Sequence, residues 1–477
     1  MAKFKQNRQS YVMLLPPSIE DFIPESHFAR VVSSIVDELD TNSIENKYSH
    51  LGQNTYHPKI LLKILFYGYA TGIRSGRKLS MLLETDTAFM YLSQMYKPDF
   101  RTINDFRKNN ASEIEGYFVD IVKICKNLGM IKLGSISVDG SKIRANAAAT
   151  RTRDKKGYEE WLEKIKGQIK DMLLEADYTD KEEDRLYKNK RGDELPKKLE
   201  KKDRLRKKIR QAVKKIKDET TKVNLTDNDA KYMKDGSGKI KLSYNGQISV
   251  SDNQIIVAAD ITSQANDRLE LKSMIEKTEE NTSRKVREVL ADAGYSSYDN
   301  YEYLNDKNID GYIPDDHFSQ VNSKSYKQTS KRYHHENFMF DKNNNCYICP
   351  EGKNLKFYKK RISDRGKIKR RQVIYRGSKC HLCMAKPNCT TQKQRTVARE
   401  LRQELLEDMR EKLLTDKGKQ KYKKRMHRVE PPFGHLKHNL GYKMFHLRSL
   451  KKVRSEFKLM CIGYNLRKIW KYQLVTA

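Results

Sequence analysis

The sequence lacks long apolar runs, and this shortage excludes a membrane-spanning protein. Its most apolar stretch, residues 60–70, is interrupted by Lys63 and falls well short of the ~20 residues that cross a bilayer. The N-terminal residues 1–8 have no apolar core of the kind found in a signal peptide. No Gly-rich loop ending in Lys-Ser or Lys-Thr is present, so nucleotide hydrolysis is not indicated. We therefore expect a cytoplasmic protein with no membrane partner.

Cysteine is also scarce. Seven cysteines in 477 residues are too few for a disulfide scaffold, and in a reducing compartment clustered thiols more often bind metal. Two Cys-x-x-Cys pairs stand about thirty residues apart, and four soft ligands with no open position predict a structural zinc site at Cys346, Cys349, Cys380 and Cys383. Cys389 is a fifth thiol that could replace one of the four. Buried free cysteines and an iron–sulfur site are the alternatives.

Positive charge is abundant. The chain carries 96 Lys and Arg against 62 Asp and Glu, a formal net charge of +34. Such a field attracts polyanions and raises their local concentration. Nucleic acid is the leading partner, ahead of an anionic membrane surface, and the length suggests about three units at roughly 150 residues per domain.

Residues 1–130 have a helical pattern, with Ile60, Leu61, Ile64 and Leu65 at helical spacing. Several short helices with brief connections are typical of a helical DNA-binding domain. If the helix around Phe106 is its recognition helix, Arg101 and Arg107 contact DNA. An ordinary solvated helix face explains either arginine equally well.

Residues 151–225 are densely charged and contain two amphipathic helical patterns, separated by a break at Gly192 and Pro196. The first pattern includes Trp161 and Ile165, and the second includes Leu205 and Ile209. We expect a helical-hairpin insertion. It acts either as a solvated arm that spaces or dimerises the protein, or as a basic arm on DNA.

Strand patterns occupy residues 131–150 and return in residues 226–318, where they alternate with helical stretches. This alternation predicts a mixed α/β domain interrupted by insertions. Asp139 and Asp292 each follow a short apolar strand, and strand ends are where open sheets place their chemistry.

A third acid, Glu430, precedes Pro431 and Pro432, which are tolerated only in the first turn of a helix, so we expect Glu430 at a helix start. Lys437 lies two turns further on the same face. Hard Mg²⁺ needs only two or three carboxylates when a substrate phosphate supplies the remaining ligands. Asp139, Asp292 and Glu430 therefore predict a Mg²⁺ (or Mn²⁺) site for phosphoryl transfer.

Four stretches carry a resemblance to a known family: Tyr56 to Arg107, Val138 to Lys142, Ala291 to Tyr295, and Arg428 to Lys437. The chain resembles the DDE insertion-sequence transposases, specifically the bacterial group with a Tyr-Arg-Glu-Lys signature. The last stretch is the most specific of the four. The resemblance implies a ribonuclease H-like catalytic core, with Asp139, Asp292 and Glu430 as metal-binding catalytic residues.

In that family, a tyrosine, an arginine and a lysine assist with DNA near the active site. Here they correspond to Tyr422, Lys437, and either Arg425 or Arg428, because the arginine-to-glutamate spacing departs slightly from the family pattern. The implied division is a helical DNA-binding domain (1–130), the ribonuclease H-like core (131–150, 226–318 and 395–477), the charged hairpin (151–225) and a zinc-knuckle insertion (319–394).

The resulting hypothesis is a DNA transposase that cleaves and joins the ends of a mobile element. Its partners are double-stranded DNA, as terminal inverted repeats and target, and a second copy on DNA, with the protein associated with the nucleoid. The alternatives are a nuclease that does not join and a non-catalytic domesticated DNA-binding protein. Asp227, Asp229, Asp260 and Asp267 are expected to cap helices or turns, with Asp260 the strongest alternative metal ligand because it also ends a strand.

Overall fold

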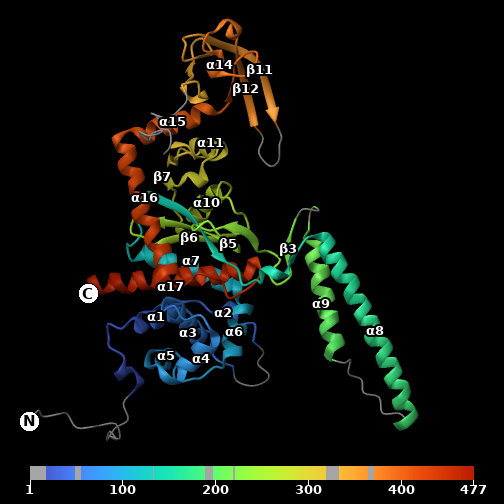
Figure 1. The fold of residues 1–477 in the computed structure, drawn as a ribbon. Coiled ribbons are helices and arrows are strands. Elements are labelled where there is room, and N and C mark those ends of the chain that lie inside the picture. Colours follow the sequence, from blue (N-terminus) through green and yellow to red (C-terminus); the bar gives the residue numbers. More distant parts are fainter. Residues whose placement is uncertain are drawn as a thin grey trace, which may run out of the picture.

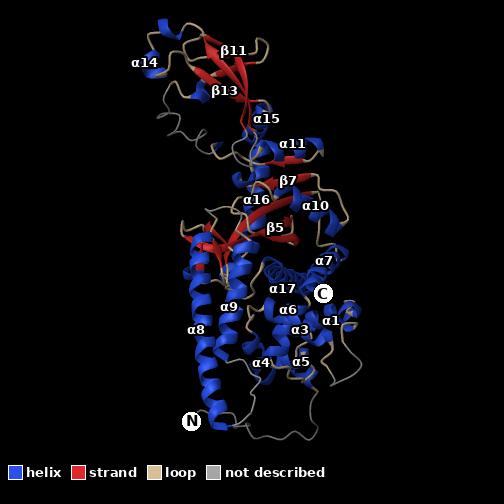
Figure 2. Cartoon of the chain, turned by 90° about the vertical axis from the view of Figure 1, so that its right-hand side faces the viewer, coloured by secondary structure: helices blue, strands red, loops and turns tan. Residues whose placement is uncertain are grey.

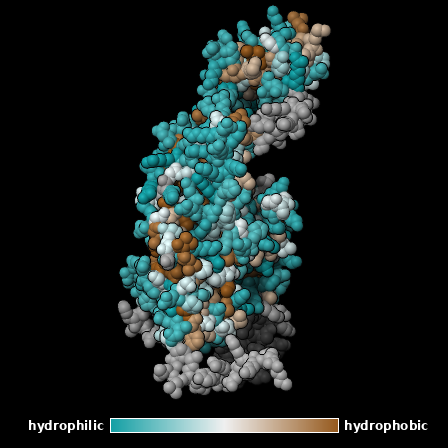
Figure 3. Space-filling model, turned by 90° about the vertical axis from the view of Figure 1, so that its left-hand side faces the viewer, coloured by the Kyte–Doolittle hydropathy of each residue, from teal (hydrophilic) through white to brown (hydrophobic). Residues whose placement is uncertain are grey.

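The protein is mixed α/β, as the alternating sequence patterns predict (Figure 1). The computed structural model describes residues 18–48, 55–132, 134–187, 197–216, 218, 221–318, 332–363 and 370–476. The Gly192–Pro196 break predicted inside the charged insertion lies outside these ranges. The face shown in Figure 3 is largely hydrophilic, in keeping with the charged composition. None of the helices in the described ranges combines the length and apolar character that a membrane span requires.

Short helices form the N-terminal part: η1 (Ile19–Phe22), α1 (Phe28–Glu38), α2 (Asn42–Glu45), α3 (Pro58–Ala70), α4 (Gly76–Thr85), α5 (Thr87–Leu92), α6 (Phe100–Asn109) and α7 (Ala111–Asn127). Helix α3 starts at Pro58, whose missing N–H costs nothing in a first turn, and the His57 side chain accepts the Lys59 N–H. Nearly every residue of α3 is buried, so this helix is the centre of the N-terminal core.

A six-stranded sheet forms the middle of the molecule, with the order β4-β5-β1-β7-β8 and β6 beside β5. Its strands are β1 (Ser135–Arg144), β4 (Lys231–Lys234), β5 (Ile240–Ser251), β6 (Ile256–Thr262), β7 (Glu288–Ala291) and β8 (Asp310–Tyr312). Strand β5 is antiparallel to β1, β4 and β6, while β1, β7 and β8 run parallel. The predicted turn at Asp252-Asn253 joins β5 to β6.

Helices cover both faces of this sheet. On one side, α17 (Leu450–Thr476) lies between the sheet and the N-terminal helices, and all three share one apolar cluster (Figure 1). On the other side, a second cluster joins the sheet to α10 (Leu271–Thr282), α11 (Tyr298–Asp306) and α15 (Gln403–Leu414). Val138 belongs to this second cluster. Successive strand residues project to opposite faces, so Asp139 projects away from it.

The charged insertion forms two long helices, α8 (Lys155–Tyr187) and α9 (Lys197–Lys214), which lie side by side and project from the sheet (Figures 1 and 2). A small core holds them together, made of Tyr158, Ile165, Ile209, Ala212, Val223 and Leu225. Two short strands, β2 (Thr152–Arg153) and β3 (Val223–Asn224), pair at the base of the hairpin. The amphipathic positions recognised in the sequence are thus the contacts between the two helices.

The cysteine-bearing part is a separate five-stranded antiparallel sheet with the order β13-β12-β11-β10-β9. Its elements are η4 (His335–Asn337), β9 (Met339–Asp341), β10 (Cys346–Ile348), β11 (Asn354–Ser363), β12 (Arg370–Gly377), η5 (Cys380–Leu382), α14 (Lys386–Cys389) and β13 (Thr396–Glu400). It has its own aromatic core and lies at the far end of α15 (Figure 1).

Helix α16 (Asp416–Gly434) corrects one expectation, because Pro431 and Pro432 lie inside it near its end and not in a first turn. A proline at position 431 removes the N–H that would bond to the His427 carbonyl. The Gln254 side chain donates to that carbonyl instead, at 2.8 Å. A π-helical turn, η6 (His435–Asn439), follows directly. Glu430 therefore stands in the last turns of α16.

Candidate active site

Asp139 and Asp292 occupy equivalent positions on two neighbouring parallel strands. Val138 in β1 is paired with Ala291 in β7, and each aspartate is the next residue along its strand. The sequence pattern predicts that Asp139 ends a strand. Strand β1 in fact continues to Arg144 alongside β5, and only its parallel partner ends here. The two carboxylates therefore lie where β7 ends and the edge of β1 is no longer paired with it.

The two carboxyl groups are partly buried, and their pKa values are raised. Burial, followed by the negative charge of Asp292, raises the pKa of Asp139 to about 7, against opposing effects from Arg425 and the Gly140 N–H. Burial also raises the pKa of Asp292, with the charge of Arg425 opposing this rise and that of Asp267 adding to it. A raised pKa means that the ionised carboxylates lack enough positive charge around them. The pair is therefore suited to a cation.

A third aspartate, Asp267, belongs to this cluster; the sequence predicted only a helix or turn cap for it, and its side chain instead accepts hydrogen bonds from neighbouring strands. It accepts hydrogen bonds from Lys142 at 3.0 Å, Asn245 at 2.5 Å and Gln247 at 2.7 Å. A Cβ atom added at Gly140 would lie 2.7 Å from an Asp267 oxygen, so the glycine after Asp139 leaves space for it. The residue is thereby held next to both aspartates.

Two cations lie over the carboxylates. The Arg425 guanidinium is 3.8 Å from Asp139. The Lys437 ammonium donates to the Ser141 hydroxyl and, at 3.1 Å, to the Lys142 carbonyl. Burial lowers the pKa of Lys437, and the charge of Asp139 opposes that shift. Helix α16 and the π-turn after it thus place Arg425 and Lys437 beside the pair.

Arg425 and Arg428, the two candidates for the DNA-contacting arginine, have different surroundings in the structure. Arg428 is buried, donating to the Ser135 hydroxyl at 2.6 Å and pairing with Asp252 at 2.5 Å, so it ties α16 to the sheet. Arg425 instead faces Asp139 and stands 5.9 Å from the Tyr422 ring centre. Burial raises the pKa of the Tyr422 phenol, as does the negative charge of Asp292. Tyr422 and Arg425 therefore belong to the candidate site.

Glu430 is exposed on α16 and makes no hydrogen bond or ion pair with the described residues. Its carboxylate is free to take a ligand, but it is not drawn into the aspartate cluster. Within the described ranges, no three Cys, His, Asp or Glu side chains form a group that could hold a metal ion.

The strongest alternative acid, Asp260, is already neutralised inside the protein. Arg454 donates to it at 2.6 Å and Lys277 pairs with its other oxygen. Burial raises the pKa of Asp260, but Lys277 and Arg454 more than offset this, and the net shift is downward. Asp227 likewise accepts a hydrogen bond from the Tyr244 hydroxyl at 2.7 Å and serves the fold.

The two DNA-contact candidates of the N-terminal helices differ in position. Arg101 is exposed at the start of α6. Arg107 is 5% exposed and donates to the Tyr69 hydroxyl at 2.9 Å and the Arg74 carbonyl at 3.0 Å. These hydrogen bonds hold α6 against α3, so Arg107 is not placed to contact DNA.

Replacing Arg107 with alanine should destabilise the protein by about 2–4 kcal/mol, because it leaves buried hydrogen-bond partners unsatisfied. Arg101→Ala is the matched control from the same helix and should change stability by less than about 0.5 kcal/mol. Urea unfolding of both variants measures the difference. Equal stabilities would contradict the structural role given to Arg107.

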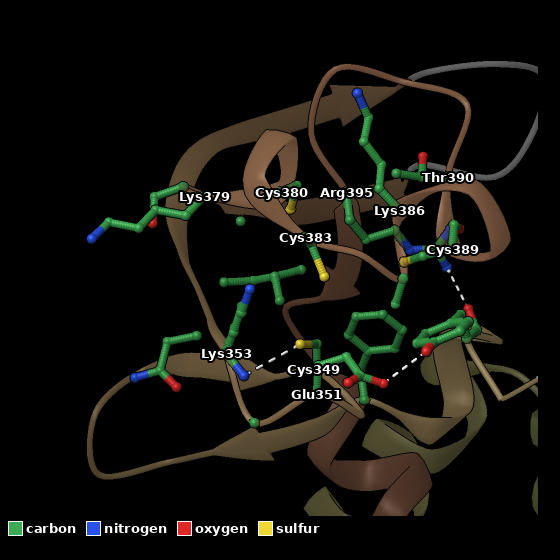
Figure 4. A pocket seen from close by; sticks show the side chains of 18 of the residues that line it. Cys349, Glu351, Lys353, Lys379, Cys380, Cys383, Lys386, Cys389, Thr390 and Arg395 are labelled. Carbon is green, nitrogen blue, oxygen red and sulfur yellow. Dashed lines mark hydrogen bonds between the residues drawn. The ribbon is translucent and has the colours of Figure 1, made fainter.

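Four cysteines line one cavity in the cysteine-bearing part: Cys349, Cys380, Cys383 and Cys389 (Figure 4). Cys346, one of the four zinc ligands predicted from spacing, does not line this cavity and is 4% exposed. Cys125 and Cys461 are buried in helices α7 and α17.

Comparison with known proteins gives two matches to family models. Residues 17–109 match a family described as a transposase domain (DUF772), and residues 348–470 match one described as a transposase DDE domain. Neither the curated proteins nor the solved structures provide a match. Asp139 and Asp292 lie between the two matched ranges, whereas Glu430 and Lys437 lie inside the second.

The two matches indicate a transposase. The C-terminal match narrows the class to the DDE family, whose domain implies an enzyme that cuts or transposes DNA. The finer group with the Tyr-Arg-Glu-Lys signature rests on the sequence resemblance alone.

Proposed function

We propose that this protein is a DNA transposase that cleaves and joins the ends of a mobile insertion element by metal-dependent phosphoryl transfer. One observation carries the proposal. Asp139 and Asp292 lie side by side, partly buried and with raised pKa values, in a chain of net charge +34. A protein that only binds DNA gains nothing from carboxylates that repel phosphate. Carboxylates that hold a cation explain the arrangement.

We propose a ribonuclease H-like core built from residues 131–150, 226–318 and 395–477. The mixed sheet supports this, because its central strand β1 and its neighbour β7 come from distant parts of the chain and bring their aspartates together. Helix α16 adds Glu430, Arg425 and Tyr422 from a third part.

In this proposal Asp139, Asp292 and Glu430 hold Mg²⁺ or Mn²⁺. Their oxygen atoms are the donors that hard cations prefer, and the raised pKa values show a shortage of positive charge between the aspartates. An ion bound there would polarise the phosphate and favour ionisation of the attacking water. Glu430, being exposed and without a partner, would complete the set.

The protein's own cations position the DNA. Arg425 and Lys437 lie beside the aspartates and would bind the oxygens of the scissile phosphate. A water oxygen bonds to phosphorus, the bond from phosphorus to the 3′ oxygen breaks, and a 3′ hydroxyl is released at the element end. The oxygen of that hydroxyl then bonds to a phosphorus of target DNA, or of the opposite strand in a hairpin route, while the bond from that phosphorus to its own 3′ oxygen breaks and a new 3′ hydroxyl leaves. Neither step needs a covalent protein–DNA intermediate.

In this proposal, other parts of the chain bind DNA, hold the dimer together or bind zinc. The helical residues 1–130, with exposed Arg101, bind the terminal inverted repeats, and a homodimer holds two ends together. The protein works in the cytoplasm in association with the nucleoid. The charged hairpin (151–225) either spaces the dimer or lies on DNA. A structural zinc ion is held in the cysteine-bearing part (319–394) by four of Cys346, Cys349, Cys380, Cys383 and Cys389.

The proposal is tested with the full chain, Mg²⁺ and DNA that carries the element ends. Joining of 3′ ends to a second DNA supports a transposase. Cleavage without joining would replace it with a nuclease, and neither reaction would leave a non-catalytic DNA-binding protein.

Asp267→Asn should lower cleavage by about 10- to 100-fold, because it removes the charge that pairs with Lys142 and replaces one of the two acceptor oxygens beside the site with an NH2 donor. Asp267 also raises the pKa values of both catalytic aspartates through its charge. The midpoint of the pH–rate profile should therefore move to lower pH in this variant. Asp260→Asn, which removes a buried aspartate outside the cluster, is the control and should leave the midpoint unchanged. An unshifted midpoint in Asp267→Asn would remove Asp267 from the site.

A further inference from the structure

Four thiols converge on one cavity of about 500 Å³ in the cysteine-bearing part. Figure 4 shows the sulfur atoms of Cys349, Cys380, Cys383 and Cys389 directed toward the same space. They come from two segments. Cys349 directly follows β10, Cys380 begins η5, Cys383 directly follows η5 and Cys389 ends α14. Two segments that are about thirty residues apart in the sequence thus contribute thiols to the same cavity.

The backbone explains why Cys380 and Cys383 act together. The Cys383 N–H donates to the Cys380 carbonyl at 3.2 Å, which closes a tight turn, and the Lys386 N–H donates to the Cys383 carbonyl at 3.0 Å. Helix α14 then carries the chain round to Cys389. A Cβ atom added at Gly377 would lie 2.6 Å from the Cys380 sulfur, so a glycine at this position leaves room for that thiol.

Cys346 is separated from this group by the geometry of its strand. Successive residues of an extended segment project to opposite sides, so residues three apart, such as Cys346 and Cys349, face opposite ways. Cys346 belongs to β10, where it pairs with Asp341 and is 4% exposed. Cys349 packs instead beside the aromatic core of this unit, together with Cys389.

A hydrogen bond from the backbone also orients one of these four thiols. The backbone N–H of Lys353 donates to the Cys349 sulfur at 3.3 Å. Hydrogen bonds of this kind orient thiolate ligands and are typical around metal sites.

We propose that Cys349, Cys380, Cys383 and Cys389 are the four ligands of a structural zinc ion, and that Cys346 is not a ligand. In the structure these sulfurs surround an open space and do not yet form a group that could hold an ion. The four thiolates would hold the ion, because sulfur ligands are those that structural zinc prefers. Four sulfurs leave no position for water, so the ion has a structural role. The ligand set does not depend on the catalytic proposal.

The test measures zinc in the full chain purified without chelator. Wild type and Cys346→Ser should each contain about one zinc per chain, whereas Cys389→Ser should contain none or a small fraction of that. Cys346→Ser and Cys389→Ser each remove one thiol from the same unit, which makes them a matched pair. Loss of zinc in Cys346→Ser with retention in Cys389→Ser would overturn the ligand set, and a zinc-free wild type would overturn the site itself.

A second measurement uses the wild-type protein and so avoids variants that fail to fold. Alkylation of the thiols, mapped by mass spectrometry before and after zinc removal, should show four cysteines that become reactive together: Cys349, Cys380, Cys383 and Cys389. Cys346 should show no such dependence on zinc. Zinc-dependent protection of Cys346 in place of Cys389 would refute the proposal. Neither outcome depends on whether the protein cleaves DNA.

Discussion

Asp139→Asn and Asp292→Asn should each lower Mg²⁺-dependent cleavage of element-end DNA by about a thousandfold or more. A metal ion contributes several kcal/mol of transition-state stabilisation, and each ~1.4 kcal/mol is a factor of ten in rate. Asparagine keeps the shape of the side chain but removes the charge that holds the cation. DNA binding should persist or strengthen, because one source of repulsion toward phosphate is gone.

The rate is measured with radiolabelled end DNA under single-turnover conditions, beside a DNA-binding assay. Asp120→Asn is the control, because Asp120 lies on α7 in a surface ion pair with Lys123 at 3.1 Å. Glu430→Gln should abolish cleavage without loss of stability, since Glu430 is exposed and lacks a partner among the described residues. Undiminished cleavage by any of the three acidic variants would remove that residue from the mechanism.

Local sequence patterns were sufficient to predict that Asp139 and Asp292 occupy equivalent strand positions. Asp139 and Asp292 each follow a short run of apolar residues, and parallel neighbouring strands place equivalent positions side by side. The same holds for the charged hairpin, where residues at helical spacing, such as Ile165 and Ile209, became the contact between two helices. In these cases the strand or helix that a residue occupies determines its neighbours.

Asp267 could not be found in this way, because its surroundings depend on strand register. Lys142 is paired with Asn245, and Gly140 with Gln247, so β1 and β5 together build the donors that hold it. One signal was present in the sequence. Asn245 and Gln247 are polar residues in an otherwise buried strand, and both are fully buried in the structure. Buried amides need partners, and a nearby aspartate is a natural one.

Two other expectations failed because a tertiary contact outweighed a local rule. Pro431 and Pro432 are accommodated inside α16 because Gln254, far away in sequence, satisfies the carbonyl that a helical N–H would have used. Arg107 matched a recognition-helix pattern, but the Tyr69 hydroxyl and the Arg74 carbonyl hold its guanidinium in the interior. Neither partner can be identified from the sequence near the residue concerned.

Asp139 should also make the stability of the metal-free protein fall as pH rises. Its pKa is raised from 3.8 to about 7 in the folded state, so the native protein retains a proton that the unfolded chain loses near pH 4. The stability this proton confers is full below about pH 4 and is lost as pH rises to about 7. Each pKa unit corresponds to about 1.4 kcal/mol, so the full loss is on the order of 4 kcal/mol.

Urea unfolding in chelator, at about pH 5 and about pH 8, measures the effect by comparing wild type with Asp139→Asn. From the lower to the higher pH, the free energy of unfolding of the variant should rise by about 2–3 kcal/mol relative to that of wild type, because asparagine cannot ionise. Excess Mg²⁺ at the higher pH should restore wild-type stability but leave the variant unchanged, since a ligand of the native state stabilises it. Asp260→Asn should instead lower stability by the same amount at both pH values, because Lys277 and Arg454 hold the pKa of Asp260 below its usual value, outside this pH range. If Asp139→Asn and wild type kept the same pH dependence, the carboxyl would be ionised throughout this range, and the charge shortage inferred for the site would be absent.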